Sequence, residues 1–563
     1  MFRYNGVTSH EMKKNNLIII MARAKGSKYI SRQNLRLVND KPLIHYILET
    51  SLKYKNADVY VSTDSEEIKE YVSMFDARII FRPKLLRKDT TTVEEIAYDV
   101  VSSLSNLNLN YEKCLVLNPK FPLIKLNTIK KFFNKLQNDV KIIYGYDENT
   151  YNYNVYKLKK STAKNEILLN IRKEIVKTEK IISFMCKPVL QRKKFSSITY
   201  GLDIPSSEIL PLNNYHDFGI FEKILNRKKI LIRIDGGHNI GIGHVYNMLT
   251  ILNHFRNDDM VIVMHHSKSV GASKFKENLY NVKIFSSQNE LFDIIKKFKP
   301  DIIFNDILDT SVEYMKKLTK NCFFIVNFED LGLGRKYADL VFNPIFNSNH
   351  HKKNEFYGSD FACVRDDFRI WKKTPIRKNA KNVLISFGGT DPTDKTNQIL
   401  RIISKTNLKF LNFTVLLGHG YLNTKKIKNL IKEMNSNGFH INIIEKSDFF
   451  VKYVRDCDFA IISNGRTVFE VACVKVPMIV IAVNPRERQH SFIKYCKAGL
   501  SLDFSSTQQN KLLIKYINKM LNFETRKYFT NNLEKTDLLN GVNKVIQIIN
   551  EKFIHKKELL HNV

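Results

Sequence analysis

The stretch ILIRIDGGHNIGIGHVYN, residues 230–247, combines three local patterns in one short segment. The apolar residues 230–232 are typical of a buried strand, and the glycines that follow allow the chain to turn sharply. Residues 245–255 then have the apolar spacing of a helix. A strand, a glycine-rich turn and a helix in this order predict a βα unit, which is the building block of an α/β fold.

The same alternation of strands and helices extends through most of the 563 residues. Towards the N-terminus, strand patterns at 17–21, 58–64 and 77–82 alternate with helical patterns at 42–52 and 65–74, and residues 145–200 are predicted to hold a loop or a β insertion. Later strand patterns lie at 383–387, 413–417, 440–444, 458–462 and 478–483. A chain of this length exceeds one ordinary core, so we expect several domains: a disordered tail (1–15), an N-terminal domain (16–226) and two further lobes (229–375 and 376–555).

The composition indicates a folded protein, with 43% hydrophobic and 26% charged residues. No apolar run approaches the roughly 20 residues of a membrane span, and the N-terminus lacks the apolar core of a signal peptide, so we expect a cytoplasmic protein. The seven cysteines are scattered and form no CxxC pair. This argues against a disulfide framework and against a zinc ribbon.

The formal net charge is +34. Nucleic-acid binding needs basic residues that are clustered, whereas the lysines here are spread along the whole chain, so we expect no nucleic-acid partner. A positive field would still attract anionic nucleotide sugars.

The glycine-rich turn at 235–244 allows three interpretations. A dinucleotide fingerprint needs a third glycine, and Tyr246 stands at that position. A metal site would use His238, His244 and perhaps Asp235, but two histidines six residues apart are not a standard ligand pair. In the third interpretation His244 lies in the first helical turn, where the positive end of the helix favours a neutral imidazole that can act as a general base. A helix-capping histidine in a tight turn remains the alternative.

Two loops farther along have the composition of phosphate-binding turns. Gly388, Gly389 and Thr390 follow one predicted strand, and residues 464–467 (Asn464, Gly465, Arg466 and Thr467) follow another. Backbone N–H groups between a strand and a helix can bind a diphosphate. Glu470, one turn into the second helix, could bind a ribose diol. Both loops in one lobe predict a sugar-nucleotide site.

Five ordered motifs over residues 228–545 resemble the UDP-sugar hydrolases of pseudaminic acid synthesis and the related spore-coat polysaccharide proteins. They are RIDGGHNIGIGHVYN, NFEDLGLGRKYADLVFNP (327–344), YGSDFACVRDDF (357–368), LISFGGTDP and ISNGRTVFEVACVKVPMIVIA. The resemblance implies a two-lobed GT-B fold that binds UDP mainly through its second lobe. It also implies that His244 activates the water that attacks the anomeric carbon, without any cofactor.

Particular residues follow from this resemblance. Asp235 joins His244 as a catalytic candidate. The UDP-binding candidates are Gly243, Gly388, Gly389, Thr390, Asn464, Gly465, Arg466, Thr467, Glu470 and Gln489. Three residues depart from the family pattern: Tyr246 and Asn247 in the segment after the histidine, and Leu308, which replaces an expected tyrosine. These departures would also suit a glycosyltransferase that uses a sugar hydroxyl instead of water.

Residues 15–226 resemble a second family, the acylneuraminate cytidylyltransferases. The stretch IIIMARAKGSKYISRQNLRLVNDKPLIHYILETSL matches their opening motif, and VYVSTDSEEI and FRPKLLRKDTTTVEE follow it. The resemblance implies a Rossmann-like nucleotidyltransferase domain that acts on CTP with Mg²⁺ and forms a homodimer. The implied CTP-binding residues are Arg23, Gly26, Ser27, Lys28, Asn34 and Arg82. Arg23 and Lys28 can neutralise a triphosphate.

This second resemblance departs from the family pattern in two places. In LNPKFPLI (117–124), four residues replace the family's Gln, Thr-Ser and Arg, and Pro211 and Asn213 stand where a metal-binding Asp-x-Asp pair is expected. Asp217 is the remaining candidate metal ligand. The sequence therefore predicts an N-terminal domain that binds a nucleotide without turning it over efficiently. Together the two resemblances predict a bifunctional enzyme of nonulosonic acid synthesis, with a glycosyltransferase or a non-catalytic nucleotide-binding module as alternatives.

Overall fold

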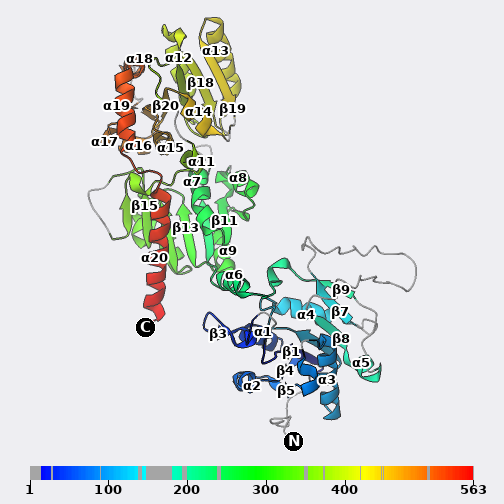
Figure 1. The fold of residues 1–563 in the computed structure, drawn as a ribbon. Coiled ribbons are helices and arrows are strands. Elements are labelled where there is room, and N and C mark those ends of the chain that lie inside the picture. The colour runs from blue at the N-terminus through cyan, green and yellow to red at the C-terminus, as the bar shows by residue number, and fades with distance from the viewer. Residues whose placement is uncertain are drawn as a thin grey trace. The chain divides into compact units, whose positions relative to one another are not determined.

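The computed structural model of the chain contains two compact units, residues 1–226 and 227–563, and each is described by itself (Figure 1). The residues that the structure describes are 14–26, 30–88, 90–136, 142–146, 181–192, 200–236, 243–269, 271–347, 353–371, 375–418, 420–445, 447, 449–503 and 508–561. The predicted disordered tail therefore lies outside the described residues except for Lys14 and Asn15.

The first unit is built on a seven-stranded sheet with the order β5-β4-β1-β6-β8-β7-β9. Strand β1 (Asn16–Met21) is central because its apolar residues 17–20 are fully buried and need neighbours on both faces. The other strands are β4 (Ala57–Thr63), β5 (Arg78–Phe81), β6 (Lys113–Leu117), β7 (Ile142–Tyr146), β8 (Ile182–Met185) and β9 (Tyr200–Asp203). The main helices are α1 (Leu43–Leu52), α2 (Glu66–Val72), α3 (Val93–Asn106), α4 (Leu126–Lys135), α5 (Cys186–Arg192) and α6 (Tyr215–Leu225).

The predicted elements of this unit are confirmed to within a few residues. Of the stretch 145–200, the structure describes the ends of β7 and β9, strand β8 and helix α5, while 147–180 and 193–199 lie outside the described residues. Strand β8 is antiparallel to both β6 and β7.

The second unit begins with a lobe whose parallel sheet has the order β12-β11-β10-β13-β14-β15-β16. The order reverses between β10 and β13, as in a Rossmann sheet. Its strands are β10 (Lys229–Ile234), β11 (Asp259–His265), β12 (Val282–Phe285), β13 (Ile302–Asp306), β14 (Phe324–Phe328), β15 (Leu340–Asn343) and β16 (Glu355–Tyr357). Its helices include α7 (Gly243–Leu252), α8 (Ala272–Glu277), α9 (Gln288–Phe298) and α10 (Val312–Thr319).

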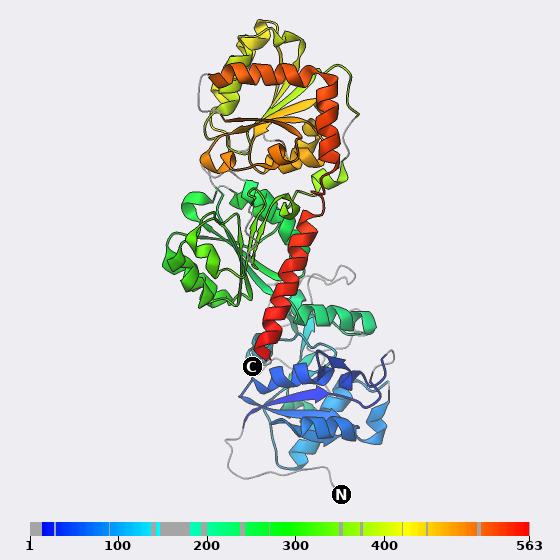
Figure 2. The ribbon, with the colours of Figure 1, turned by 90° about the vertical axis from the view of Figure 1, so that its left-hand side faces the viewer.

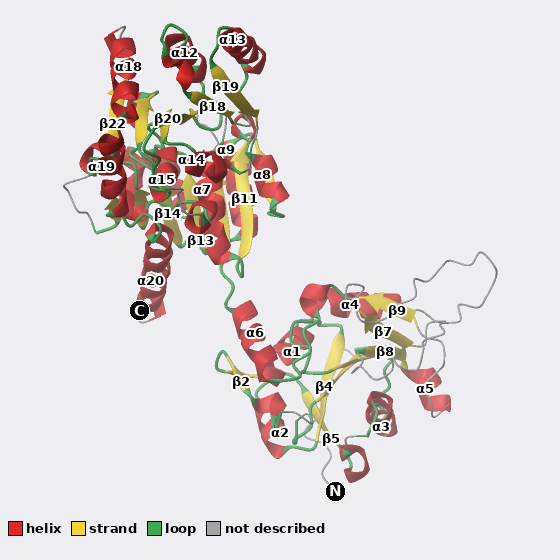
Figure 3. Ribbon diagram, turned by 45° about the horizontal axis from the view of Figure 1, so that its top comes forward, coloured by secondary structure: helices red, strands yellow, loops and turns green. Residues whose placement is uncertain are grey.

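A second lobe repeats this plan with the parallel order β19-β18-β17-β20-β21-β22. Its strands are β17 (Asn382–Ser386), β18 (Asn412–Leu417), β19 (His440–Glu445), β20 (Phe459–Ser463), β21 (Met478–Ala482) and β22 (Gly499–Asp503). Its helices include α12 (Lys395–Ile403), α13 (Thr424–Ser436), α14 (Phe450–Asp456), α15 (Thr467–Cys473), α18 (Gln508–Leu521) and α19 (Phe523–Glu534). Helices cover both faces of each sheet (Figure 3), so the predicted α/β class with two Rossmann-type lobes is confirmed.

The point where the strand order reverses decides where a site can form. At such a point the loops after two neighbouring strands diverge to opposite faces and leave a crevice at the carboxyl ends of the strands. In the first lobe these strands are β10 and β13, and in the second lobe they are β17 and β20. All three motifs that the sequence singled out here, at 235–244, 388–390 and 464–467, directly follow one of these strands.

The C-terminal helix corrects one predicted boundary. The predicted second lobe (376–555) includes most of helix α20 (Gly541–His561), but this helix returns to the first lobe (Figure 2). Val545, Ile549 and Phe553 lie in the same hydrophobic core as strand β10. Apolar side chains on one face of the helix complete that core, which the sequence pattern could not assign to either lobe.

The chain passes from the first lobe to the second near residue 362 and returns near residue 541. These two segments contact each other. A Cβ atom added to Gly541 would collide with the backbone carbonyl oxygen of Ala362.

Among the described residues, no helix is both long enough and apolar enough to span a bilayer.

Candidate functional site

A buried histidine–aspartate pair lies at the reversal point of the first lobe. His244 follows β10, in the first turn of α7, and Asp306 ends β13, so adjacent strands bring the two side chains together. The Nδ1 atom of His244 forms a short hydrogen bond with Oδ1 of Asp306. His244 is 6% exposed and Asp306 is fully buried.

Arg466 reaches this pair from the second lobe. Its Nε donates to Oε1 of Glu329 at 2.6 Å, and its Nη2 lies 3.3 and 3.4 Å from the two carboxylate oxygens of Asp306. Glu329 follows β14 with a left-handed backbone (φ 53°), an unfavourable conformation for a residue with a side chain. Burial works against ionisation of Asp306, but its interactions with His244 and Arg466 outweigh this effect and hold the pKa of Asp306 below its usual value.

These contacts determine where the imidazole proton lies. Asp306 is an ionised acceptor, so Nδ1 of His244 carries the proton and donates it to this carboxylate. Nη2 of Arg466 lies 2.9 Å from the same Nδ1, but two donors cannot bond to each other, so the guanidinium bonds to the carboxylates instead. Nε2 is then the nitrogen with a free lone pair, which is the arrangement of a general base oriented by a carboxylate.

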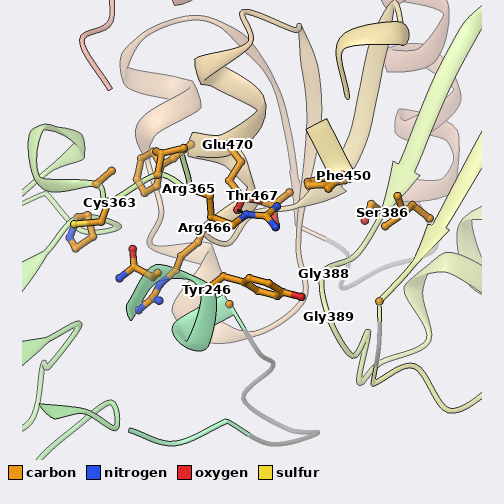
Figure 4. A pocket seen from close by; sticks show the side chains of 18 of the residues that line it. Tyr246, Cys363, Arg365, Ser386, Gly388, Gly389, Phe450, Arg466, Thr467 and Glu470 are labelled. Carbon is orange, nitrogen blue, oxygen red and sulfur yellow. Dashed lines mark hydrogen bonds and ion pairs between the residues drawn. The ribbon is translucent and has the colours of Figure 1, made fainter. Parts of the chain in front are cut away.

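A pocket opens beside this pair, between the two lobes of the second unit. Figure 4 shows the side chains around it. The first lobe contributes Gly243, Tyr246 and Asn247 from α7; residues 362–365 come from the segment that connects the lobes. The second lobe contributes Ser386, Gly388, Gly389, Gly418, Phe450, Arg466, Thr467 and Glu470. The pocket therefore lies against the loops after β17 and β20.

Glu470 has a partner that the sequence did not predict. Nε of Arg365 donates to Oε1 of Glu470 at 2.7 Å, and both side chains are largely buried, at 15% and 17% exposed. The guanidinium also lies over the rings of Tyr246 (4.8 Å) and Phe450 (5.8 Å). Burial lowers the pKa of Arg365, but Glu470 more than compensates and raises it. Tyr246, a departure from the family pattern, thus supports a cation in the pocket.

Gly418 allows the first phosphate-type loop to pack closely against the end of β18. A Cβ atom added to Gly418 at the end of β18 would collide with the backbone of Gly389. The loop at 388–389 can therefore lie directly against β18 and present its backbone to the pocket.

Other predicted UDP-binding residues lie behind the pocket or away from it. Thr390 is buried, and Asn464 uses its Nδ2 to donate to the backbone oxygens of Glu487 (2.8 Å) and His490 (3.0 Å). Gly465 packs against Glu487, while Gln489 is exposed. None of these four is among the residues that line the pocket. Asn464 and Gly465 are placed to support the loop after β20. A role of these four residues in UDP binding stays a prediction.

Asp235 was predicted to act with His244, but its carboxylate forms other contacts. Its carboxylate is paired with Nη1 of Arg233 at 2.5 Å and with Nζ of Lys268 at 3.0 Å. The carboxylate bound to His244 is that of Asp306. Asp235 lies next to it only through the backbone, where its N–H donates to the Asp306 carbonyl at 3.2 Å.

In the first unit, the loop after β1 brings several predicted CTP-binding residues together. The side chain of Arg23 donates to the carbonyl of Gly26, and Nδ2 of Asn34 donates to the carbonyl of Arg23 at 3.0 Å. Ser27 and Lys28 lie outside the described residues. The structure thus describes a turn held together by its own polar groups.

Arg82 directly follows strand β5, which pairs with β4. Its Nη2 donates to the Ser62 carbonyl at 3.0 Å, and it is 4% exposed. Burial lowers the pKa of Arg82 to about 10, and the nearby charge of Asp64 counteracts this only in part. Asp64 also accepts from the backbone N–H of Ala24 at 2.7 Å, so it ties the β1 loop to β4.

Asp217 does not fit the predicted metal site. Its carboxylate accepts from the backbone N–H groups of Asn213 (2.7 Å) and Asn214 (3.1 Å), and it forms a capping box at the start of α6. Pro211 and Asn213 offer no carboxylate beside it. In the part of the chain that the structure describes, no three His, Cys, Asp or Glu side chains are grouped to hold a metal ion. The residues present do not match the Mg²⁺ site that the resemblance implies.

Comparisons with known proteins divide the chain in the same way. Residues 17–193 match the family model described as Cytidylyltransferase. An uncharacterised protein of Methanocaldococcus jannaschii is 30% identical over 277 residues, which are 46% of this chain and 57% of that protein, so the alignment covers little more than half of this relative. The spore coat polysaccharide biosynthesis protein SpsG of Bacillus subtilis is 23% identical over 44% of this chain and 75% of that protein.

One relative aligns with both units. The pseudaminic acid cytidylyltransferase and UDP-2,4-diacetamido-2,4,6-trideoxy-β-L-altropyranose hydrolase of Helicobacter pylori is 22% identical over 496 residues, 83% of this chain and 88% of that protein. Among solved structures, MurG of Acinetobacter baumannii matches with a TM-score of 0.43 and 12% identity over 57% of this chain and 99% of that one. The family match to residues 17–193 and the similarity to the Helicobacter pylori and Bacillus subtilis proteins confirm both resemblances drawn from the sequence motifs.

Proposed function

We propose that the chain is a bifunctional nucleotide-sugar enzyme of nonulosonic acid synthesis. In this proposal the second unit hydrolyses a UDP-linked amino sugar and releases UDP. The first unit binds CTP for the activation of an acidic sugar. The similarity of both units to one cytidylyltransferase and hydrolase of Helicobacter pylori supports the pairing of these two activities.

The observation that carries the hydrolase proposal is the oriented His244–Asp306 pair beside a pocket formed by two phosphate-type loops. Asp306 holds the proton on Nδ1, so Nε2 is free to take a proton from water. The water oxygen bonds to the anomeric carbon as the bond from that carbon to the β-phosphate oxygen breaks. The departing UDP takes the bonding electrons, and the imidazolium then returns its proton to solvent or product.

The second lobe supports the departing nucleotide in this proposal. The backbone at Gly388–Gly389 and the N-terminal turn of α15 at Thr467 both line the pocket, and such turns favour phosphate. Glu470, which is paired with Arg365, is the candidate for the ribose hydroxyls.

The direct test is ³¹P NMR of the purified protein with UDP-2,4-diacetamido-2,4,6-trideoxyhexoses. We expect UDP and free sugar from the wild type and a loss of at least about 100-fold in His244→Ala, since a general base typically contributes that much. The exposed His440 on β19 provides the matched control, His440→Ala. In water enriched in ¹⁸O, attack at carbon leaves the UDP phosphorus signals unshifted.

The product distinguishes this proposal from its main alternative. Free sugar indicates hydrolysis, whereas UDP release that requires an added acceptor and yields a sugar–acceptor product indicates a glycosyltransferase. Full activity in His244→Ala would remove the proposed base from either reaction.

For the first unit we propose CTP binding around the loop after β1, between Arg23 and Arg82. The match to the cytidylyltransferase family supports the ligand. No step through a metal ion is proposed, because the candidate ligands do not fit one. Calorimetry with CTP and an assay for pyrophosphate release with pseudaminic, legionaminic and sialic acids test binding and turnover separately. Binding that Arg82→Ala leaves unchanged would contradict this location.

A further inference from the structure

We propose that Arg466 is a positioning residue that joins the two lobes and holds the carboxylate that orients His244, so that the base is in place only when the lobes are together. This inference rests on the proposed function of His244 and extends it to the second lobe. It gives Arg466 a role in addition to the UDP binding predicted from the sequence.

The first argument is where the contacts of Arg466 lie. The residue precedes α15 in the second lobe, yet its hydrogen bonds go to Glu329 and Asp306, which end neighbouring strands of the first lobe. The distances of 2.6 Å to Glu329 and 3.3 Å to Asp306 are those of a charge-assisted contact. The guanidinium therefore holds the carboxylate that orients His244.

The second argument is the charge around the imidazole. Among the described residues, the charged and titratable groups with a recorded contact or electrostatic interaction with His244, Asp306 or Arg466 include Glu329, which contacts Arg466, and the thiol of Cys363. Burial raises the pKa of Cys363 to about 12, so this thiol is uncharged. Without Arg466, the buried carboxylates of Asp306 and Glu329 would lose the cation that contacts both of them, and the contact of Asp306 with His244 would be less well held.

The third argument is a donor without a partner. Nη1 of Arg466 is buried and has no hydrogen-bond partner among the described residues, although a buried guanidinium normally uses all its N–H groups. Arg466 also lines the pocket. An oxygen of the diphosphate would satisfy this donor. A nucleotide bound to the second lobe would then stabilise the same side chain that orients the base in the first.

The experiment compares Arg466→Gln and Arg466→Lys with a matched control, Arg486→Gln. Arg486 is a second arginine between the lobes: Nη1 lies 3.0 Å from Asp309 and Nη2 donates to the Glu329 carbonyl, but neither contact involves His244 or Asp306. Thermal melting shows whether each variant is folded. The titration of His244 is followed by NMR of protein labelled with [¹³Cε1]histidine, and its signal is identified by its loss in His244→Gln.

In Arg466→Gln we expect the titration midpoint of His244 to move up by at least about one pH unit, as expected for loss of a charge within a few ångströms. Arg486→Gln should leave the midpoint in place, and Arg466→Lys should restore most of it. For UDP release, kcat of Arg466→Gln should fall by about 100-fold, with the acid limb of its pH profile moved in the same direction.

Two results would overturn the inference. One is an unchanged His244 midpoint in folded Arg466→Gln, and the other is an equal shift in Arg486→Gln, which would reduce Arg466 to a general contact between lobes. The proposed function fails separately, if the wild type releases no UDP from any sugar nucleotide. The NMR titration needs no turnover, so it decides the role of Arg466 in that case as well.

Discussion

Replacing Glu487 with Gln should stabilise the second lobe at neutral pH and have almost no effect near pH 4. Burial raises the pKa of the Glu487 carboxyl from 4.5 to about 7. Between these two values the folded protein keeps a proton that the unfolded chain has released. The free energy of unfolding therefore falls as the pH rises through this window.

The size of the effect follows from the shift. A difference of one pKa unit corresponds to about 1.36 kcal/mol, so the full cost of ionising buried Glu487 is about 3 kcal/mol. Gln avoids this cost, and its side-chain oxygen can still accept from the backbone N–H of Val483, as Oε2 of Glu487 does at 3.1 Å. The variant should exceed the wild type by about 1.4 kcal/mol at pH 5.5 and about 3 kcal/mol at pH 7.5.

A nearby histidine produces the opposite trend. Burial lowers the pKa of His490 from 6.5 to about 4, so the unfolded chain binds the extra proton, and stability is lost as the pH falls from 6.5 towards 4. Between pH 4.5 and 6.5 the two groups oppose each other in the wild type. Glu487→Gln should therefore show the steep acid destabilisation that His490 causes.

Fluorescence of Trp371, the only tryptophan, provides the assay. Its ring lies 5.5 Å from that of Phe449 and beneath the guanidinium of Arg455 (5.2 Å), so unfolding of the second lobe should alter its emission. Guanidinium chloride titrations of both proteins from pH 4.5 to 8 give the difference in unfolding free energy. A difference that stays constant over this range would refute the reasoning, because Glu487 would then not titrate in this window.

Three further substitutions test the packing around the site. Gly418→Ala should displace the backbone of Gly389, lower the melting temperature and weaken UDP binding at least about 10-fold by calorimetry; unaltered affinity would contradict the close packing. Gly541→Ala should force α20 away from Ala362 and lower the melting temperature, and an unchanged temperature would exclude that contact. Ile549→Ala should destabilise the first lobe by about 2–4 kcal/mol in denaturant titration, a range typical of a buried large-to-small change; a loss below 0.5 kcal/mol would mean that α20 contributes little to that core.

The strands and the glycine-rich loops could be predicted from the sequence because their signals are local. Runs such as 230–232 and 478–483 are apolar enough to indicate buried parallel strands, and the glycines and His244 follow directly. The partner of His244 could not be predicted this way. Asp306 meets it only because β13 lies beside β10, and strand order is a property of the folded sheet.

Other residues were misplaced for the same physical reason. Asp235 is near His244 in the chain, but its carboxylate turns to Arg233 and Lys268, whereas Asp217 forms a helix cap. One signal could have identified Asp306 earlier: an acidic residue that ends an apolar strand pattern, at the edge where a Rossmann sheet forms its crevice.

The return of α20 to the first lobe also affects how the protein is made. A ribosome completes the strands of the first lobe before it begins β17, yet three side chains of that lobe's core belong to residues 541–561. Until those residues leave the exit tunnel, the nascent first lobe exposes an apolar face next to the strand that carries the loop with His244. During synthesis the second lobe therefore has the chance to fold first, and His244 reaches its final surroundings last.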